Sequence, residues 1–343
     1  MCLRQTVFIA ACAVSIGWAA AAAAQASAQH GAGHGPSAAM SLATPTLSTT
    51  RIAENVYLVG GDAANTGFIV GREGVIVIDT QRSVDAAKAQ IAQIAKVTPQ
   101  PVRTVIVTHG DPDHVGGLPA YSAGATIIAH ENIRAQILAT AAQPASASPF
   151  VGAYKTIAET RLPNRTIALT QSMEIDGVPV ILLHVAPAHS AGDLIVFLPR
   201  QKTVFVGDLL TVKEATYPII HVGGSSIGWI RMMKEMLALD ADIFVAGHGA
   251  LNTRAELTEL LGKVEQRRDA IKAMIMQGKT LPEINAALPE EKISPAFLGF
   301  NETTYYELTR GYPEAQAPWV SLKPNDVRRY VASPVAPPVA PVP

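Results

Sequence analysis

Four side chains that can bind a metal ion lie within the six residues 109–114. They are His109, Asp111, Asp113 and His114. Three more candidates follow at wider spacing, namely His189, Asp208 and His248. Imidazole and carboxylate together suit zinc, iron or manganese. The pattern predicts a metal centre to which several separate segments of the chain contribute.

Each candidate ligand follows an apolar run that is typical of a buried strand. These runs are 102–107, 178–185, 203–206 and 243–246. Strand ends at one edge of a sheet converge in space, so these loops can build one site. A further run, 74–79, ends on Asp79. We expect Asp79 either to hold a ligand or loop by a hydrogen bond, or only to close a strand-end turn.

The rest of the chain alternates strands and helices, which favours an α/β protein. Further strands are expected at 55–60, 66–70, 125–129, 166–169, 173–175 and 194–198. Helices are expected at 83–96, 131–141, 227–239, 253–277 and 301–310, and a small-residue loop at 143–153. The candidate ligands span 109 to 248 without a long linker, so that range must fold as one unit.

The order of these segments resembles the metallo-β-lactamase-fold superfamily over roughly residues 50–255. The resemblance rests on Asp79, the 109–114 cluster with Gly116-Gly117, the His189-Ser190 turn, Gly207-Asp208 and Gly247-His248. It implies an αββα four-layer sandwich with a C-terminal helical extension. The superfamily's usual cluster is H-x-H-x-D-H, whereas this chain has Asp111 at the second histidine position.

The resemblance also implies a ligand set for two divalent ions. The first ion would be bound by His109, Asp111 and His189. The second would be bound by Asp113, His114 and His248, with Asp208 as the bridge. Zinc is the expected metal, and iron or manganese are alternatives because a carboxylate at 111 hardens the first site. A solvent-facing Asp111 with a single bound ion is the other alternative.

A water held between two divalent ions loses a proton near neutral pH and becomes a nucleophile. The expected function is therefore a metal-dependent hydrolase that attacks a small-molecule ester, lactone or amide, β-lactams included, through a metal-bound hydroxide. Asp113 and Asp208 are the expected catalytic carboxylates, with Asp113 orienting the hydroxide. Asp111 motivates one alternative, an iron-dependent sulfur dioxygenase-like oxidoreductase. The H-x-D-x-D-H pattern motivates another, a phosphodiesterase or nuclease, and metal binding without catalysis is a third.

The expected partner is a small molecule. The net charge of −1 argues against a nucleic-acid partner. The segment before the helix at 227 is expected to overhang the metals, and it holds four candidate substrate contacts. These are Lys213, Tyr217, His221 and Ser225. Neither the substrate's identity nor the oligomeric state follows from the sequence.

The N-terminus has the pattern of a signal peptide at 1–28, with a basic start, an apolar stretch and the cleavage motif Ala26-Ser27-Ala28. It predicts a periplasmic or secreted protein without stable membrane association after cleavage. Both cysteines, Cys2 and Cys12, lie in this segment, so the mature chain would have no thiol. The domains expected after it are a flexible lead-in (29–48), a metallo-β-lactamase-fold domain (49–255), a helical extension packed on the core (256–330) and a Pro/Ala-rich tail (331–343).

Overall fold

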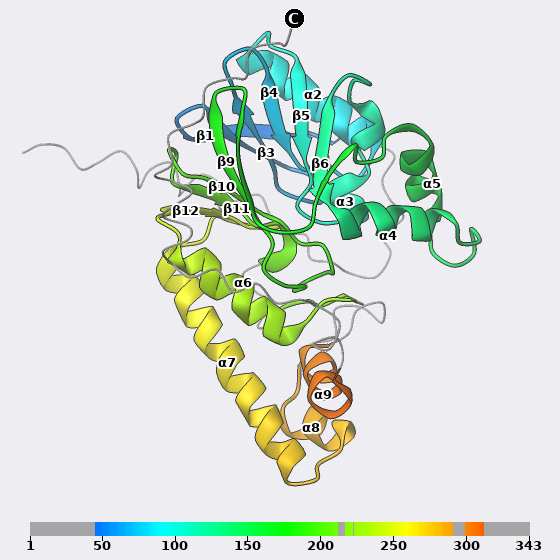
Figure 1. Ribbon diagram of the computed structural model, residues 1–343, viewed down its shortest axis with the longest axis vertical. Helices are drawn as coiled ribbons and strands as arrows, with labels where there is room; N and C mark the ends of the chain where they lie inside the picture. The colour runs from blue at the N-terminus through cyan, green and yellow to red at the C-terminus, as the bar shows by residue number, and fades with distance from the viewer. Residues whose placement is uncertain (1–44, 212–216, 222, 291–298, 312–343) are drawn as a thin grey trace, which may run out of the picture. The chain divides into compact units, whose positions relative to one another are not determined.

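Two β-sheets with helices on their outer faces make up the described part of the chain (Figure 1). The computed structural model describes residues 45–211, 217–221, 223–290 and 299–311. All of these residues belong to one compact unit. The predicted signal peptide, most of the 29–48 lead-in, the 331–343 tail and parts of the 256–330 extension lie outside the described residues.

The first sheet has seven strands in sequence order. They are β1 (Ser48–Ala53), β2 (Val56–Gly60), β3 (Thr66–Val70), β4 (Val75–Ile78), β5 (Val102–Ile106), β6 (Thr126–His130) and β7 (Arg165–Ile167). Strands β1 to β4 pair antiparallel, whereas β4 to β7 pair parallel. The parallel strands alternate with α2 (Val84–Val97), α3 (Pro112–Val115), η1 (Leu118–Ala120), α4 (Glu131–Ala141) and α5 (Val151–Thr160).

The second sheet has five strands in the order β12-β11-β10-β9-β8. They are β8 (Gln171–Ile175), β9 (Val178–Leu183), β10 (Ile195–Leu198), β11 (Thr203–Phe205) and β12 (Ile243–Val245). Only β11 and β12 pair parallel. The helical elements of this half are η2 (Gly207–Leu209), α6 (Ser226–Ala238), α7 (Arg254–Met276), α8 (Leu281–Ala287) and α9 (Phe300–Arg310).

The four layers follow from alternation along the strands. In β4, Val75 and Val77 pack with helices α2, α4 and α5, whereas Ile76 and Ile78 pack between the two sheets. In β9, Val180 and Leu182 face the first sheet, and the neighbouring Ile181 and Leu183 face α6 and α7. Strands buried on both faces need apolar residues on both, which explains why their sequences are continuous apolar runs. The predicted αββα sandwich is confirmed.

The C-terminal helices of the described part lie on the second sheet's side. Helix α7 starts with a capping box, in which the Thr253 hydroxyl caps the Glu256 backbone and the Glu256 side chain caps Thr253. Its buried residues Leu257, Leu261 and Val264 pack into the same core as α6, and α7 also contacts α9 (Figure 1). Within the described residues, no helix combines the length and the hydropathy that crossing a membrane requires.

Two elements differ from the sequence-based expectation. Strand β1 lies at a sheet edge, and its residues are exposed or half-buried. Its sequence therefore lacks the apolar run from which a strand is predicted. Helix α5 starts at Val151, inside the predicted 143–153 loop. Its first turn follows a run of Pro, Ala and Ser that carries a loop signal, and only Val151, Tyr154 and Ile157 are buried.

Candidate metal centre

The predicted ligands lie beyond the ends of strands in both sheets, at one end of the sandwich. His109 follows β5, and Asp111 is the N-cap of α3, which carries Asp113 and His114. His189 lies between β9 and β10, Asp208 lies in η2 after β11, and His248 follows β12. The chain thus brings loops of both sheets to a common site.

Two glycines allow the second sheet's loops to come close. Gly207 has φ of 53°, a left-handed backbone that favours glycine. A Cβ on Gly247 would lie 1.9 Å from Oδ1 of Asp208. The Asp208 loop and the His248 loop therefore pack backbone to side chain, which a larger residue at 247 would prevent.

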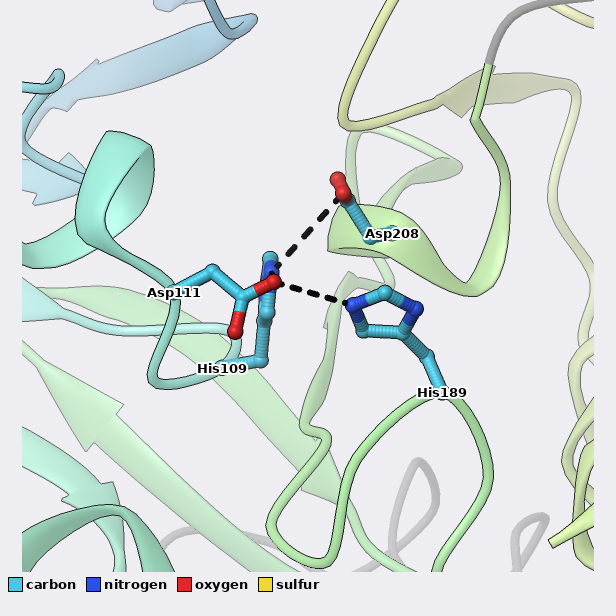
Figure 2. Close-up of side chains that lie close together, drawn as sticks. All are labelled: His109, Asp111, His189 and Asp208. Carbon is cyan, nitrogen blue, oxygen red and sulfur yellow. Dashed lines mark hydrogen bonds and ion pairs between the residues drawn. The ribbon is translucent and has the colours of Figure 1, made fainter. Parts of the chain in front are cut away.

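The first cluster consists of His109, Asp111, His189 and Asp208, whose ligand atoms all lie within 4.8 Å of one another (Figure 2). Oδ2 of Asp111 lies 3.3 Å from Nε2 of His189 and 3.5 Å from Nε2 of His109. Nε2 of His109 lies 3.9 Å from Oδ2 of Asp208. All four side chains are buried. Asp111 thus points into the site and not to solvent.

The second cluster consists of Asp113, His114 and His248, within the same 4.8 Å limit. Asp208 contacts this cluster too. Its Oδ1 lies 3.2 Å from Nε2 of His114, and its Oδ2 lies 3.2 Å from Nε2 of His248. The Asp208 carboxylate therefore lies between the two clusters, where a bridging ligand would be.

Each of the four histidines in the two clusters has a partner on Nδ1, on the side away from the centre. A carbonyl or carboxylate partner accepts the proton of Nδ1, so Nε2 offers its lone pair to the centre. The partners are Asp79 Oδ2 for His114 (2.8 Å), Ile219 O for His189 (2.8 Å), Ala63 O for His248 (2.7 Å) and Thr108 Oγ1 for His109 (3.1 Å).

Asp79 holds both a predicted ligand, His114, and a loop. Besides contacting His114, it accepts hydrogen bonds from the backbone N–H of Thr108 (2.8 Å) and from the Thr108 hydroxyl (2.7 Å). Its own backbone has φ of 58°, which is unusual for a residue other than glycine. Backbone strain of this kind persists where the surroundings fix it, and here it directs the carboxylate into the hydrogen-bond network.

Within the site, the charges of the carboxylates and the histidines stabilise each other. Burial opposes the charge of Asp111, but His221 and His109 beside it hold the pKa of this carboxyl well below its usual range. Burial likewise opposes the charge of Asp208, and His248 and His114 hold its pKa well below the usual range. Burial lowers the pKa of His189, yet the hydrogen bond and charge of Asp111 raise it to about 9. The buried carboxylates thus favour positive charge at the centre, which a bound cation supplies.

The side chains fit divalent metal ions. Among the described residues, the buried atoms His109 Nε2, His114 Nε2 and Asp208 Oδ1 make no hydrogen bond. His114 Nε2 and Asp208 Oδ1 lie 3.2 Å apart, so both can bind the same ion. Buried polar atoms without a partner are costly and call for an explanation, and metal ions bound at the two clusters would provide one. Imidazole nitrogen with carboxylate oxygen is a donor set for zinc, iron or manganese.

The four predicted substrate contacts lie in different surroundings. Lys213 is outside the described residues. The Tyr217 ring stacks on Phe300 with centroids 5.8 Å apart, and the Arg267 guanidinium lies 4.6 Å from it. Ser225 is fully buried and caps α6 by accepting a hydrogen bond from Gly228. His221 reaches the metal centre, with Nε2 3.2 Å from Asp111 Oδ2.

Several residues that support the site carry no signal in the sequence. Ala63 and Ile219 contribute only their carbonyl groups, which any residue has. The Tyr154 hydroxyl donates to the carbonyl of Gly110 (2.7 Å) and steadies the ligand loop from α5, the helix that the sequence did not predict. Thr108 precedes the cluster, but only the fold shows that it joins Asp79 to His109.

Residues 59–248 match the profile of the metallo-beta-lactamase superfamily. The match covers more than half of the chain, and the chain belongs to this superfamily. The predicted family is confirmed, and a probable metallo-hydrolase of Bacillus subtilis is among the relatives.

Two curated relatives illustrate the range of the family. The α subunit of 2,4-dinitroanisole O-demethylase from Nocardioides sp. is 27% identical over 206 residues, which cover 60% of this chain and 58% of the relative. A linear primary-alkylsulfatase from Pseudomonas sp. is 24% identical over 279 residues, covering 68% and 51%. The chain thus spans about half the length of these relatives.

Solved structures share the fold. A stereoselective inverting sec-alkylsulfatase from Pseudomonas sp. superposes with a TM-score of 0.59 at 17% identity, covering 80% of this chain and 52% of that one. A metallo-beta-lactamase from Pontibacter korlensis superposes with a TM-score of 0.53 at 20% identity, covering 64% and 99%. At these identities the likeness establishes architecture alone.

Proposed function

We propose that the protein is a metal-dependent hydrolase of a small-molecule ester, lactone or amide. The observation that carries this proposal is the position of Asp208, whose two oxygens each lie 3.2 Å from a histidine of the second cluster and whose Oδ2 also faces the first. Two adjacent clusters that share one carboxylate suit a pair of ions acting on one water and one substrate.

The residues of each cluster have separate tasks in this proposal. His109, Asp111 and His189 would hold the first ion, and Asp113, His114 and His248 the second, with Asp208 shared. The ions, when bound, acidify a coordinated water and polarise the bond to be broken. The buried ligands keep bulk water from competing for these positions.

Asp113 is the natural residue to orient the attacking water. Its side chain is 21% exposed, whereas that of Asp208 is 6% exposed. Its Oδ2 lies 3.4 Å from Nε2 of His248, so the carboxylate lies at the centre and is still partly accessible to solvent. A carboxylate in that position accepts a hydrogen bond from water and fixes the direction of attack.

Alkyl sulfates belong on the list of esters to be tested. The alkylsulfatase match covers 68% of this chain, which is more than the 59–248 range of the family profile covers. The match therefore extends beyond the part that holds the metal ligands. β-Lactams, which are cyclic amides, also belong among the substrates to be tested because a metallo-beta-lactamase from Bacillus sp. is 21% identical over 229 residues.

A combined metal and substrate assay tests the proposal. The protein is purified, its metal content is measured, and it is offered a carboxyl ester, a lactone, a β-lactam, a thioester, an alkyl sulfate and a bis-aryl phosphate. We expect zinc, chelator-sensitive hydrolysis of at least one ester, lactone or amide, and no turnover by the chelated protein. Bound metal without any turnover would overturn the proposal.

Two other results would favour the alternatives. Bound iron together with oxygen uptake on persulfide would favour the sulfur dioxygenase-like oxidoreductase. Hydrolysis of the bis-aryl phosphate alone would favour the phosphodiesterase.

Export is a separate part of the proposal. The basic start, the apolar stretch and Ala26-Ser27-Ala28 support removal of residues 1–28 and a periplasmic or secreted location. The mass of the protein recovered from the periplasm or the medium should equal that of a chain that begins at residue 29. Recovery of full-length protein in the membrane fraction would contradict the export proposal and leave the hydrolase proposal intact.

A further inference from the structure

Three imidazole nitrogens converge on one oxygen of Asp111. Nε2 of His221 lies 3.2 Å from Oδ2, Nε2 of His189 lies 3.3 Å from it, and Nε2 of His109 lies 3.5 Å from it. His109 and His189 are ligands that the family pattern implies. His221 comes from the segment between η2 and α6, which the family pattern does not include.

His221 is fixed to the ligand His189 through the backbone. Its own N–H donates to the carbonyl of His189 (2.7 Å), and Nδ1 of His189 donates to the carbonyl of Ile219 (2.8 Å). The two imidazole rings lie 4.4 Å apart between centroids. The segment 219–221 thus contacts both the main chain and the side chain of His189, which keeps the two imidazoles side by side.

Buried neighbours hold this segment in place. Ile220 is fully buried in the core that contains α6, and Ile219 is 7% exposed. The carbonyl of His221 accepts a hydrogen bond from Gly224 (2.9 Å) just before helix α6. The backbone of His221 is thus held on both sides, so only the side-chain torsions lose freedom when the imidazole binds an ion, which favours a role as ligand.

We propose that His221 is a ligand of the first metal position, where it supplies the imidazole that Asp111 replaces in the 109–114 cluster. The first ion would then have three imidazoles, from His109, His189 and His221, together with carboxylate oxygens. Three imidazoles with oxygen donors form a zinc site, whereas two imidazoles among carboxylates form a harder one. The inference rests on the proposed function only in requiring that the centre binds metal.

Metal binding tests the inference directly. The wild type, His221→Ala, His221→Gln and the double variant Asp111→His/His221→Ala are compared for metal equivalents, for zinc affinity against a chelating dye, and for the visible spectrum of the Co²⁺ form. We expect His221→Ala and His221→Gln to bind one metal equivalent as tightly as the wild type and the other about 10–100-fold more weakly or worse. Loss of a residue that only supports a ligand already lowers metal affinity by this factor.

The double variant gives the sharpest result. Asp111→His restores H-x-H-x-D-H, so it should return the weakened equivalent towards wild-type affinity and restore the Co²⁺ spectrum. Its recovery also shows that the loss in the single variants does not come from misfolding. The matched control is His34→Ala, which removes a histidine of the lead-in and should change neither equivalent.

Other outcomes overturn the inference. If the single variants bind both equivalents with wild-type affinity and an unchanged Co²⁺ spectrum, His221 is no ligand, and a raised KM would make it a substrate contact instead. That result leaves the hydrolase proposal standing. If the wild type binds no metal, the inference and the proposed function fall together.

Discussion

Nδ1 of His114 lies 2.8 Å from Oδ2 of Asp79, and Thr108 donates two hydrogen bonds to the same carboxylate. One side chain at the end of β4 therefore fixes a ligand on α3 and the loop that leaves β5. The carboxylate accepts three hydrogen bonds and donates none, a task that an amide of the same size cannot perform.

Asp79→Asn should weaken metal binding about 10–100-fold, as expected for a residue that orients a ligand. The amide nitrogen cannot accept, so either His114 or Thr108 loses its partner. Zinc affinity is measured by competition with a chelating dye. Asp85→Asn is the control, since Asp85 is an exposed residue of α2 that pairs with Lys88 in a solvated contact. Equal zinc affinity for the two variants would show that Asp79 does not position His114.

Asp208→Ala should remove both ions and lower kcat/KM by more than about 100-fold, because the shared ligand contributes more than a supporting residue does. Metal content and turnover are measured on the same preparation. Asp240→Ala is the control, because Asp240 is an exposed partner of Lys202. Retained metal together with a retained rate would refute the bridging role of Asp208.

Gly247→Ala should destabilise the fold by about 1–3 kcal/mol, the usual cost of overpacking, because its Cβ would meet Oδ1 of Asp208. The displaced carboxylate should also bind metal less well. Gly262→Ala is the matched variant, since this position inside α7 has open space around the added carbon. It should gain about 0.5–1 kcal/mol from helix propensity. Urea unfolding compares them, and equal midpoints would contradict the packing argument.

Acid should destabilise the fold through His184. Burial, with the neighbouring His130, lowers the pKa of His184 to about 4, and the two rings lie 3.9 Å apart. The unfolded value is about 6.5, so the neutral folded form contributes its full stability above pH 6.5 and loses it as the pH falls towards 4. Asp193 and Glu131 oppose this shift only in part.

His184→Asn tests this pH dependence. The amide nitrogen replaces Nδ1 as donor to the carbonyl of Asp193, which now lies 2.8 Å away, and the variant has no proton to gain. The free energy of unfolding of the wild type should therefore fall more steeply than that of the variant between pH 6.5 and 4. Parallel curves would show that His184 does not titrate in this range.

The strands that are buried on both faces and the group of candidate ligands could be predicted because both produce local patterns in the sequence. Val75 to Ile78 is buried on both faces, so the run is apolar throughout, and the 109–114 cluster is compact enough to see directly. Edge strand β1 and helix α5 are less visible, since β1 is largely exposed and α5 starts inside a Pro/Ala/Ser-rich stretch.

The contacts that orient the side chains of the centre could not be predicted from the sequence. His221 is separated from Asp111 by 110 positions, and nothing between them fixes its distance until α6 and the His189 turn are packed. The carbonyls of Ala63 and Ile219 have no side-chain signature at all. Side-chain type therefore predicts which residues are candidate ligands, whereas the fold determines how they are oriented.

The ligands come from both sheets, and this has a mechanical consequence. His109 and His114 follow β5 of the first sheet, whereas Asp208 and His248 follow β11 and β12 of the second. Ions held among them would cross-link the two halves of the sandwich at one end, as a disulfide would. Loss of metal should accordingly weaken the packing between the two sheets first. Slower hydrogen exchange of the interior strands after metal is added would show this effect.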